Sequence, residues 1–532
     1  MRTAATYLIE LLEAYGVEIV FGIPGVHTIE LYRGLAASRI RHITPRHEQG
    51  AGFMADGYAR AGGRPGVCFV ISGPGLTNIA TAMAQAYADS VPMLVISSVN
   101  ASVTLGRGTG QLHELPDQRG LAAQVTAFSH TVRDPGELPA LLASAFALFE
   151  SARPRPVHLE LPLDVLAASA EDLPAAQPVV PIARAVPKAA DLDRAAALLS
   201  AALSPLILAG GGARHAAPAL RQLAERLDAP LVMSVNGRGL VPPDHPLGIS
   251  FSASLPAIRA LITEADTVLA IGTELGQTDY DMYAEGGFSI PGTLIRLDID
   301  AGQPSRNCPA EVALLGDAAA GCAGLLDRLA AEPADRRGAT RAAIACDAAR
   351  RALSPGMTRD LALLTAARDT LPDAMLVGDS TRLVYAGNLG FAASAPSGWF
   401  NAATGYGALG YGLPAAIGAA LARPDRPVLC LCGDGGLQFT LAELGTAIEA
   451  GIPLTLLLLN NFGYGEIKSA MLAAGVTPVG VDLHTPDFQA LARAFGWSAE
   501  LLDRAEDLPV RLRAAAAGTR PVLIELREPS GG

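Results

Sequence analysis

Short runs of β-branched residues and leucine alternate with longer Ala/Leu-rich stretches along nearly the whole chain. This alternation constrains the fold more than any other feature, because strands that alternate with helices form parallel sheets covered by helices on both faces. The chain has 532 residues, too many for one hydrophobic core, which indicates about three domains. We therefore predict an α/β protein with three doubly wound parallel-sheet domains.

Composition marks the expected boundaries of these domains. The range 171–190 is rich in proline and has little periodicity, as expected of a linker. A polar, Ala/Arg-rich range, 332–355, is expected to connect the second domain to the third. The predicted domains are thus 1–170, 191–331 and 356–532. Their strands are expected at 67–71, 93–97 and 157–161, at 206–209, 231–234, 268–271 and 294–298, and at 375–377, 428–432, 454–459 and 522–526.

The charge balance excludes some classes of partner. The chain has 40 Lys plus Arg against 52 Asp plus Glu, so its net charge is 40 − 52 = −12. Without a basic cluster, this charge argues against binding to nucleic acid or to an anionic membrane. Six cysteines are too few for a disulfide framework, which favours free thiols in a reducing compartment. The first residues indicate an amphipathic helix followed by a strand and not a signal peptide, so we expect a cytoplasmic protein.

A long stretch without any charged residue runs from Leu383 to Ala422. Asparagines, prolines and many glycines interrupt its apolar residues, so it does not resemble a membrane span. We interpret it as buried, glycine-rich backbone around a bound molecule.

Gly433-Asp434-Gly435 and Asn460-Asn461 each directly follow an apolar strand. In a parallel sheet both segments would lie at the carboxyl edge, where open α/β sheets bind ligands. A carboxylate and an amide there could share a hard cation such as Mg²⁺, and the glycines would expose N–H groups to a phosphate. Each segment alone is also a common turn signal, but both at strand ends indicate a metal-phosphate site.

These segments resemble the thiamine-diphosphate enzyme superfamily, of the acetolactate synthase and 2-oxo-acid decarboxylase kind. The resemblance covers nearly the whole chain. It also rests on the segments GYGLPAAIGAALA, FGIPG, RHEQGAGFMADGYAR and SGPG. It implies a pyrimidine-binding domain, a central Rossmann-like domain and a diphosphate-binding domain, matching the three domains predicted above. It also implies thiamine diphosphate and Mg²⁺ as cofactors.

The resemblance further assigns roles to individual residues. Asp434 and Asn461 would bind Mg²⁺ through their side chains and Gly463 through its carbonyl. Gly407 would offer its carbonyl to the cofactor's amino group, and Leu409 would lie beneath the thiazolium. The remaining cofactor contacts are expected at Gly25, Gly73, Ser380, Thr381, Gly433, Gly435, Gly436 and Tyr464.

Glu48, within Pro45-Arg46-His47-Glu48-Gln49, is the first candidate for catalysis. In the superfamily this glutamate hydrogen-bonds the cofactor's aminopyrimidine and so promotes loss of the thiazolium C2 proton. A carboxyl that shares a proton suits an apolar cleft, because burial raises the pKa of a carboxyl group. On the local sequence alone, a surface glutamate at a helix start is an equal alternative.

Two histidines bear on the type of reaction. His27 follows Gly25 and Val26 in FGIPGVH, and benzaldehyde lyase resembles this chain in having a histidine there. His113, in GQLHE, replaces the glutamine that is usual in acetolactate synthases. A histidine pair could relay the proton that decarboxylation requires, although a lone histidine more often caps a loop or a helix.

The central domain lacks the segments with which acetolactate synthases bind FAD, so FAD is not expected. Its segment TDYDMYAEGG instead contains Asp279, Asp281 and Glu285, an acidic cluster of a kind that is usually a solvated loop. In a cleft, such carboxylates would match a guanidinium. The segments GVHTIELYRGL, LHELPDQ and GTELGQTDYDMY resemble bacterial 2-ketoarginine decarboxylases. Val26, Asp279, Asp281 and Glu466 are the expected substrate contacts.

The predicted activity is therefore non-oxidative decarboxylation of a 2-oxo acid, with 5-guanidino-2-oxopentanoate as the first choice of substrate. An acetolactate synthase-like or benzaldehyde-lyase-like carboligase acting on 2-oxo acids or aldehydes is the alternative, and a non-catalytic paralogue is a third possibility. The resemblance also implies a homodimer or homotetramer with its active site between subunits. The small-residue flanks of Glu48 and the range 412–422 fit helices at such an interface or in an ordinary core.

Overall fold

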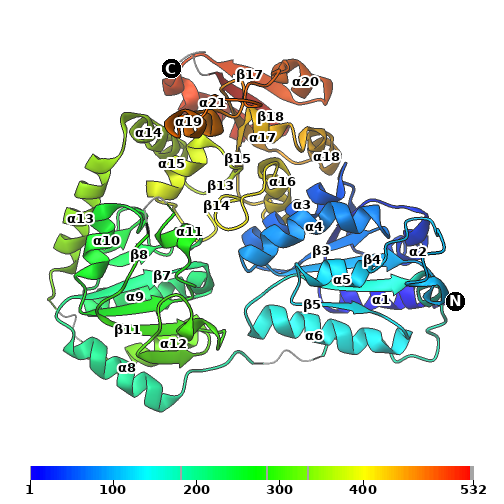
Figure 1. Cartoon of the computed structure of the whole chain (residues 1–532), viewed down its shortest axis with the longest axis horizontal. Coiled ribbons are helices and arrows are strands. Elements are labelled where there is room, and N and C mark those ends of the chain that lie inside the picture. The colour runs from blue at the N-terminus through cyan, green and yellow to red at the C-terminus, as the bar shows by residue number, and fades with distance from the viewer. Residues whose placement is uncertain (1, 180–182, 283–285, 332–334, 528–532) are drawn as a thin grey trace. The chain divides into compact units, whose positions relative to one another are not determined.

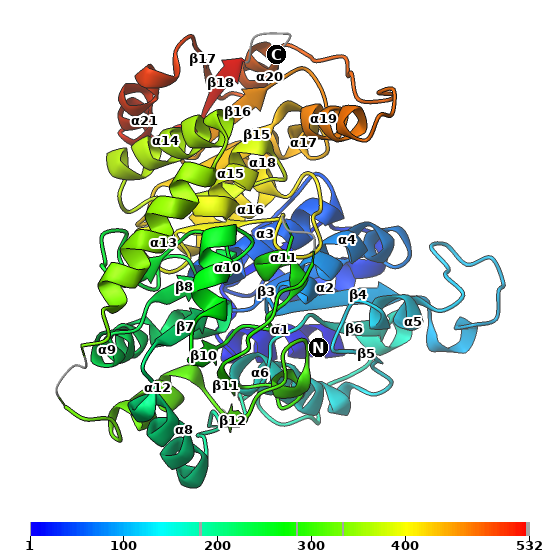
Figure 2. The ribbon, with the colours of Figure 1, turned by 60° about the vertical axis from the view of Figure 1, so that its left-hand side comes forward.

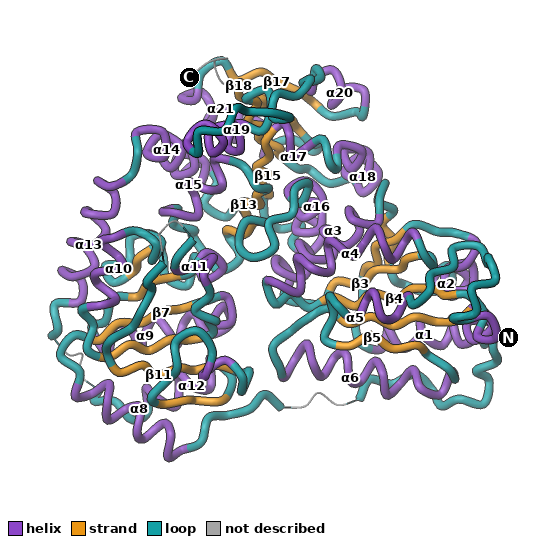
Figure 3. Tube along the Cα trace, viewed as in Figure 1, coloured by secondary structure: helices purple, strands orange, loops and turns teal. Residues whose placement is uncertain are grey.

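The computed structural model describes residues 2–179, 183–282, 286–331 and 335–527. Strands and helices alternate along this part of the chain (Figure 3). They form three six-stranded sheets, and the paired strands run parallel. The prediction of an α/β protein with three parallel sheets is therefore confirmed.

The chain folds into two compact units that interleave in sequence. The first unit comprises residues 1–182, 405–501 and 515–532, and the second comprises residues 183–404 and 502–514. The first sheet lies in the first unit and the second sheet in the second. No helix among the described residues is long and apolar enough to cross a membrane.

The first sheet has the strand order β2-β1-β3-β4-β6-β5. Apolar residues of α1 (Ala4–Ala14) and α6 (Leu138–Ser151) pack on one face of this sheet, while α3 (Glu48–Gly62) and α4 (Pro74–Ala88) cover the other (Figure 1). The strands are β1 (Ile19–Gly22), β2 (Arg41–Ile43), β3 (Gly66–Val70), β4 (Met93–Val99), β5 (Phe128–Thr131) and β6 (Val157–Pro162). The smaller helices are α2 (Ile29–Leu35), α5 (Gln118–Ala123) and α7 (Leu163–Leu166).

Helix α3 also packs against α16 (Gly412–Ala422), which follows it by several hundred residues in the same unit. A Cβ atom on Gly57 would lie 2.0 Å from the Ala415 carbonyl oxygen, and one on Gly418 would lie 1.9 Å from that of Met54. Only glycine allows the two backbones to approach this closely. The small-residue helices predicted for an interface or a core therefore pack against each other within one chain.

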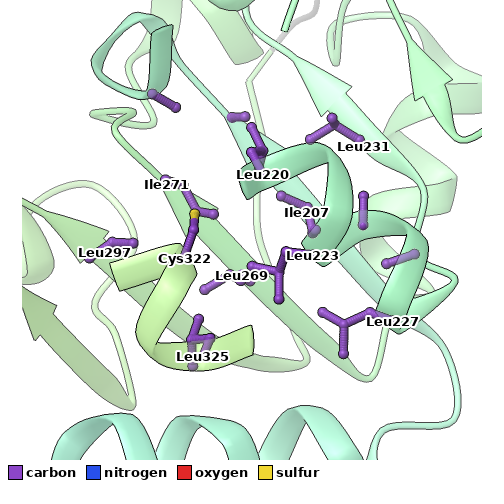
Figure 4. Packing of buried hydrophobic residues seen from close by; sticks show 14 of the residues in the cluster. Ile207, Leu220, Leu223, Leu227, Leu231, Leu269, Ile271, Leu297, Cys322 and Leu325 are labelled. Atoms are coloured by element: carbon purple, nitrogen blue, oxygen red, sulfur yellow. The ribbon is translucent and has the colours of Figure 1, made fainter. Parts of the chain in front are cut away.

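The second sheet has the order β12-β11-β10-β7-β8-β9. Ile207, Leu269 and Leu297 point to the face covered by α8 (Ala189–Ala201), α9 (Ala217–Leu227) and α12 (Ala318–Leu326) (Figure 4). Leu206 and Val268 belong to the core cluster on the other face. That face is covered by α10 (Pro256–Thr263) and α13 (Gly338–Ala352) (Figure 2). This is the two-residue alternation of a strand buried on both faces. The strands are β7 (Pro205–Ala209), β8 (Leu231–Met233), β9 (Gly248–Ile249), β10 (Thr267–Ile271), β11 (Thr293–Asp298) and β12 (Val312–Leu315).

Two sequence features of this region have structural explanations. The range 332–355, predicted as a connector, contains α13, whose alanines belong to the core of the second unit. The glycine triplet at 210–212 meets the Gly272 loop, because a Cβ atom on Gly210 would lie 2.4 Å from the Gly272 carbonyl oxygen. The triplet therefore serves close packing between two loops at the ends of β7 and β10.

The third sheet consists of β13 to β18. In the first unit β16 pairs with both β15 and β18, with Cys430 opposite Leu456. In the second unit β13 pairs with β14. The strands are β13 (Met375–Gly378), β14 (Trp399–Asn401), β15 (Val428–Gly433), β16 (Thr455–Asn460), β17 (Ser498–Leu502) and β18 (Val522–Arg527). The other helices of the chain are α11 (Gln277–Tyr280), α14 (Pro355–Thr370), α15 (Arg382–Gly390), α17 (Asp434–Leu437), α18 (Leu444–Ala450), α19 (Gly465–Ala473), α20 (Phe488–Ala494) and α21 (Leu508–Ala516).

Candidate active site

Glu48 is the first residue of α3, where the chain turns from β2 into the helix. His47 caps this helix by accepting the Gln49 N–H on its ring nitrogen Nδ1 at 3.1 Å. The Glu48 side chain is almost buried, and its Oε2 accepts a 2.9 Å hydrogen bond from Asn78 Nδ2 of α4. Asn78 thus holds one carboxyl oxygen of the predicted catalytic residue, a role that no local pattern indicates.

His27 and His113 lie together at the carboxyl edge of the first sheet. His27 is in the short helical turn Val26–Thr28 after β1, and His113 is in the loop after β4. Their rings meet edge to face with 5.3 Å between centroids. Burial, and to a smaller extent the neighbouring His113, lowers the pKa of His27. The predicted pairing of the two histidines is therefore present in the folded chain.

A chain of hydroxyl groups orients the His27 ring. Ser72 Oγ lies 2.9 Å from His27 Nδ1 and 3.1 Å from Ser98 Oγ, which also accepts the Ser72 N–H. When Ser98 donates to Ser72 and Ser72 donates to Nδ1, the proton of neutral His27 is on Nε2. In this arrangement the serines would favour the Nε2–H tautomer of the imidazole.

Glycines and amides fix the loops that carry the two histidines. Gly73 has a φ of 64°, and a Cβ atom on it would lie 2.5 Å from the His113 carbonyl oxygen, so this position requires glycine. Gln118 accepts the Gly73 N–H at 2.8 Å and donates to the Ser98 carbonyl at 2.9 Å. Asn100 donates to the carbonyl of Leu112, the residue before His113, at 2.8 Å. Gly25 is similarly close-packed, because its Cβ atom would meet the Ile71 side chain at 2.5 Å.

Asp434, Asn461 and Gly463 converge at the carboxyl edge of the third sheet. Asp434 is almost fully buried after β15, and burial raises the pKa of its carboxyl group. The Asn461 amide oxygen faces only acceptors, at 3.0 Å from Asp434 Oδ1 and 2.8 Å from the Gly463 carbonyl oxygen. Asp434 Oδ2 is buried and has no hydrogen-bond partner among the described residues. With the amide reversed, its nitrogen would donate to both of these oxygens; in the present orientation the three oxygens face one another, as the ligands of a cation do.

The spacing of these oxygens fits magnesium. An octahedral Mg²⁺ site with bonds of 2.0–2.1 Å places adjacent oxygens about 2.9 Å apart. The two measured separations, 2.8 and 3.0 Å, lie on either side of that value. Among the described residues no cluster of three His, Cys, Asp or Glu side chains could hold a metal. One carboxylate, one amide and one backbone carbonyl are the kinds of oxygen ligand that Mg²⁺ accepts.

The glycines around these ligands allow close approach. Gly463 has a φ of 152°, and a Cβ atom there would lie 2.2 Å from the Val481 carbonyl oxygen. A Cβ atom on Gly435 would lie 2.6 Å from the Tyr464 ring, so this aromatic side chain covers the turn after Asp434. Gly433 ends β15, and Gly436 lies within the single turn of α17.

A buried charged cluster holds the loop that contains Gly407 and Leu409. Gln85 Oε1 accepts the N–H of Ala408 at 3.2 Å, and Asp56 accepts a 2.5 Å hydrogen bond from the hydroxyl of Tyr411. Arg60 joins these two contacts, because it donates to Asp56 at 2.6 Å and to Asp89 at 2.7 Å, and Asp89 accepts from Gln85. The loop is therefore held at both ends by α3 and α4.

The second unit contains the other predicted positions. Ser380 and Thr381 lie between β13 and α15, and Ser380 Oγ is buried without a hydrogen-bond partner among the described residues. Asp281 forms an ion pair with Arg259 at 2.5 Å, and Asp279 accepts the Val235 N–H at 3.2 Å. Glu285 lies outside the described residues.

The structure brings the predicted residues of the first unit into two groups. Glu48, His27 and His113 (the Glu48 group) each follow a strand of the first sheet, whereas Asp434, Asn461 and Gly463 (the Asp434 group) converge after strands of the third. In the described part of the chain, no hydrogen bond or ion pair connects the two groups. Val26 and Glu466 are exposed, the former beside His27 and the latter in the first turn of α19.

Comparison with known proteins identifies this arrangement. Models of the N-terminal thiamine pyrophosphate (TPP) binding domain, the central domain and the C-terminal TPP binding domain of thiamine pyrophosphate enzymes match residues 2–121, 192–325 and 377–526. The probable 2-ketoarginine decarboxylase AruI of Pseudomonas aeruginosa is 51% identical over 529 residues, which cover 99% of this chain and 94% of that protein. This chain belongs to the thiamine pyrophosphate enzyme family.

More distant relatives are acetolactate synthases. The large subunit of acetolactate synthase isozyme 1 of Escherichia coli is 32% identical over 99% of this chain and 94% of its own length. The large subunit of the Parasynechococcus marenigrum enzyme is 31% identical over 98% of this chain and 87% of its own length. In this chain, the region matched by the N-terminal TPP binding domain contains Glu48. The region matched by the C-terminal TPP binding domain contains Asp434, Asn461 and Gly463.

Proposed function

We propose that this protein is a thiamine-diphosphate- and Mg²⁺-dependent decarboxylase that converts 5-guanidino-2-oxopentanoate (2-ketoarginine) into 4-guanidinobutanal and CO₂. The observation that carries this proposal is the 51% identity, over almost the full length of both chains, to a probable 2-ketoarginine decarboxylase. The histidine pair supports it, because a decarboxylase must add a proton to carbon after CO₂ leaves.

The residues of this chain have distinct tasks in that reaction. When bound, thiamine diphosphate supplies a carbon nucleophile and an electron sink for the breaking bond. Glu48, held by Asn78, would hydrogen-bond the cofactor's pyrimidine ring, and Asp434, Asn461 and Gly463 would hold the Mg²⁺ ion. The C–C bond to the carboxylate breaks, CO₂ leaves, and one proton is added to the carbon that carried it.

His27 and His113 are proposed to provide that proton. With its Nδ1 accepting from Ser72, neutral His27 presents Nε2–H as a donor. Burial and the neighbouring His113 lower the pKa of His27, and two imidazolium rings with centroids 5.3 Å apart would repel each other. One ring is then the acid and the other is the base that receives a proton when the aldehyde forms.

Val26 and Glu466 are proposed to contact the substrate. Asp279 and Asp281 of the second unit are proposed to contribute less directly. Glu466 offers an exposed carboxylate to a cationic tail. Asp281 already binds the guanidinium of Arg259 and is therefore a weaker receptor for a second one.

The active site is proposed to form between the subunits of a homodimer or a homotetramer. The absence of a hydrogen bond or ion pair between the Glu48 group and the Asp434 group, within the described residues, supports this. Exposed apolar side chains near the histidines also support it: Val26, Ile29 and Leu112 are 63%, 54% and 60% exposed. We place the protein in the cytoplasm, where its six free cysteines would remain reduced.

Turnover of two substrates tests the proposal. The purified protein with thiamine diphosphate and Mg²⁺ should release CO₂ and an aldehyde from 2-ketoarginine, and do so much more slowly from pyruvate. The second candidate is a carboligase, which the acetolactate synthase relatives favour. Formation of acetolactate from pyruvate, with no CO₂ from 2-ketoarginine, would refute the decarboxylase and establish the carboligase.

A further inference from the structure

Glu443 is a buried carboxylate that the proposed reaction does not use. It ends the short helical turn Leu441–Glu443, which follows Asp434 and precedes Asn461 in the first unit. Only 1% of its surface is exposed. Its backbone partners belong to the segment that precedes Glu48, several hundred residues earlier in the chain.

The two oxygens of Glu443 accept hydrogen bonds from the backbone of that segment. The Arg46 N–H lies 3.0 Å from Oε1 and 3.1 Å from Oε2, and the His47 N–H lies 3.2 Å from Oε1. The Thr446 hydroxyl donates to Oε2 at 2.7 Å. All of these partners are donors, so the ionised carboxylate satisfies every one of them.

Glu443 also touches the first turn of α3 beyond Glu48. A Cβ atom on Gly50 would lie 2.3 Å from Glu443 Oε1. The carboxylate is therefore in contact with the backbone on both sides of Glu48, at Arg46 and His47 before it and at Gly50 after it. Negative charge at this end of a helix is also favoured by the helix dipole.

We infer that Glu443 is a positioning residue that fixes the direction in which Glu48 leaves the backbone. Glu48 makes one side-chain hydrogen bond, to Asn78, and that bond alone leaves its backbone free to shift. Removing the anion from Arg46 and His47 would loosen the turn into α3. Small displacements of a catalytic group lower rates steeply, because the reacting geometry must be held within about 0.5 Å. This inference rests on the proposed role of Glu48 in activating the cofactor.

The test uses Glu443→Gln, which keeps the shape of the side chain but places an amide nitrogen among the donors. The matched control is Glu449→Gln, which removes an exposed carboxylate that pairs with the side chain of the same Arg46. Thr446→Val removes one donor to Glu443 and provides a milder variant.

Two measurements separate positioning from general loss of structure. The first is amide hydrogen–deuterium exchange of residues 46–50 in the protein without cofactor. The second is the rate at which the thiazolium C2 proton of thiamine diphosphate exchanges with D₂O in the Mg²⁺-loaded protein. For Glu443→Gln we expect faster amide exchange in this segment and C2 exchange slowed about 10–100-fold, with cofactor affinity within about threefold of wild type.

The outcomes are distinct. Thr446→Val should show the same effects at smaller size, and Glu449→Gln should show neither. If Glu443→Gln folds poorly, the test rests on Thr446→Val. Unchanged C2 exchange in Thr446→Val then overturns the inference. Unchanged C2 exchange in Glu443→Gln also overturns it, as does a loss explained by weaker cofactor binding. Glu48→Gln separates the two proposals, because unchanged C2 exchange in that variant would refute the role of Glu48 itself.

Discussion

The imidazole rings of His27 and His113 meet edge to face, with 5.3 Å between their centroids and 85° between their planes. Each ring comes from a different loop at the carboxyl edge of the same sheet, and Gly73 lies against the His113 backbone. This contact contributes, after burial, to lowering the pKa of His27.

Replacing His113 tests whether this contact serves protonation of carbon. His113→Gln should lower the rate of aldehyde release about 10²–10³-fold, because a positioned proton donor contributes about 10²–10⁴-fold. Aldehyde is measured by a coupled dehydrogenase, and CO₂ is measured separately. His130→Gln, at a half-exposed histidine on β5, is the control and should leave the rate unchanged. An unchanged rate in His113→Gln would contradict the assignment.

The tautomer of His27 should depend on Ser72. In wild type, nitrogen-15 chemical shifts of labelled histidine should show His27 as the Nε2–H form. Ser72→Ala removes the hydroxyl at Nδ1 and should give a mixture of both tautomers, with turnover lowered about 10-fold. Ser129→Ala, which removes a hydroxyl from His158 instead, should leave the His27 signals in place. A wild-type spectrum of the Nδ1–H form would exclude the proposed orientation.

Mg²⁺ should bind through Asp434. Asp434→Asn removes the one charged oxygen of the proposed metal site, and we expect the apparent affinity for thiamine diphosphate to fall at least about 10²-fold at fixed Mg²⁺. Titration calorimetry with and without EDTA measures this change. Asp482→Asn, at an exposed carboxylate paired with Lys468, is the control and should stay within about twofold of wild type. Cofactor binding that EDTA does not weaken would count against the site.

Arg60 should be important for stability. Arg60→Met leaves Asp56 and Asp89 buried without their cation, so we expect a loss of about 3–5 kcal/mol in the free energy of unfolding. Arg64→Met breaks an exposed ion pair with Glu18 just beyond the same helix and should cost less than about 1 kcal/mol. Thermal and urea unfolding followed by circular dichroism compares the two variants. If the two variants lost the same free energy of unfolding, the buried pairing of Arg60 with Asp56 and Asp89 would not be a net source of stability.

Acid should destabilise the protein through His158. This imidazole is fully buried between Ser97 and Ser129, and burial lowers its pKa from 6.5 to about 3. The unfolded chain therefore takes up a proton below pH 6.5 that the folded chain does not, and stability falls as the pH decreases from 6.5 towards 3. The expected slope is about 1.4 kcal/mol per pH unit from this group. His158→Gln should show a shallower dependence between pH 6 and 4, and an unchanged slope would argue against the assignment.

The central strands of every sheet were predicted from the sequence, as were the Gly433-Asp434-Gly435 and Asn460-Asn461 segments at the ends of two of them. The strands that were not predicted, such as β2, β5, β12 and β17, lie at the edges of the sheets. Edge strands are partly exposed, so their residues lack the continuous apolar run of a buried strand. Asp434 and Asn461 were predicted to lie together because each follows an apolar strand, and Gly463 was added from the family resemblance.

Residues that act across the chain were not predictable in this way. Asn78, Gln85 and Glu443 are single polar residues in helical segments, where the same pattern usually marks a solvated surface. Their partners are distant in sequence: Glu443 binds Arg46, and Gln85 binds Ala408. Only the packing of α3 and α4 against the later part of the first unit reveals these contacts.

The contact between α3 and α16 has a consequence for how the chain is made. The strip around Gly57 has no side chain of its own to cover it and is filled by Gly418 and Ala415. At about 5–20 residues per second, a ribosome needs roughly 20–70 s to synthesise the chain between the two helices. For most of that interval, once α7 has been synthesised, the first sheet and its helices are complete in sequence, but the face of α3 that packs on α16 is still uncovered. We therefore expect a nascent chain truncated before α16 to bind chaperones, and one that includes it to be released.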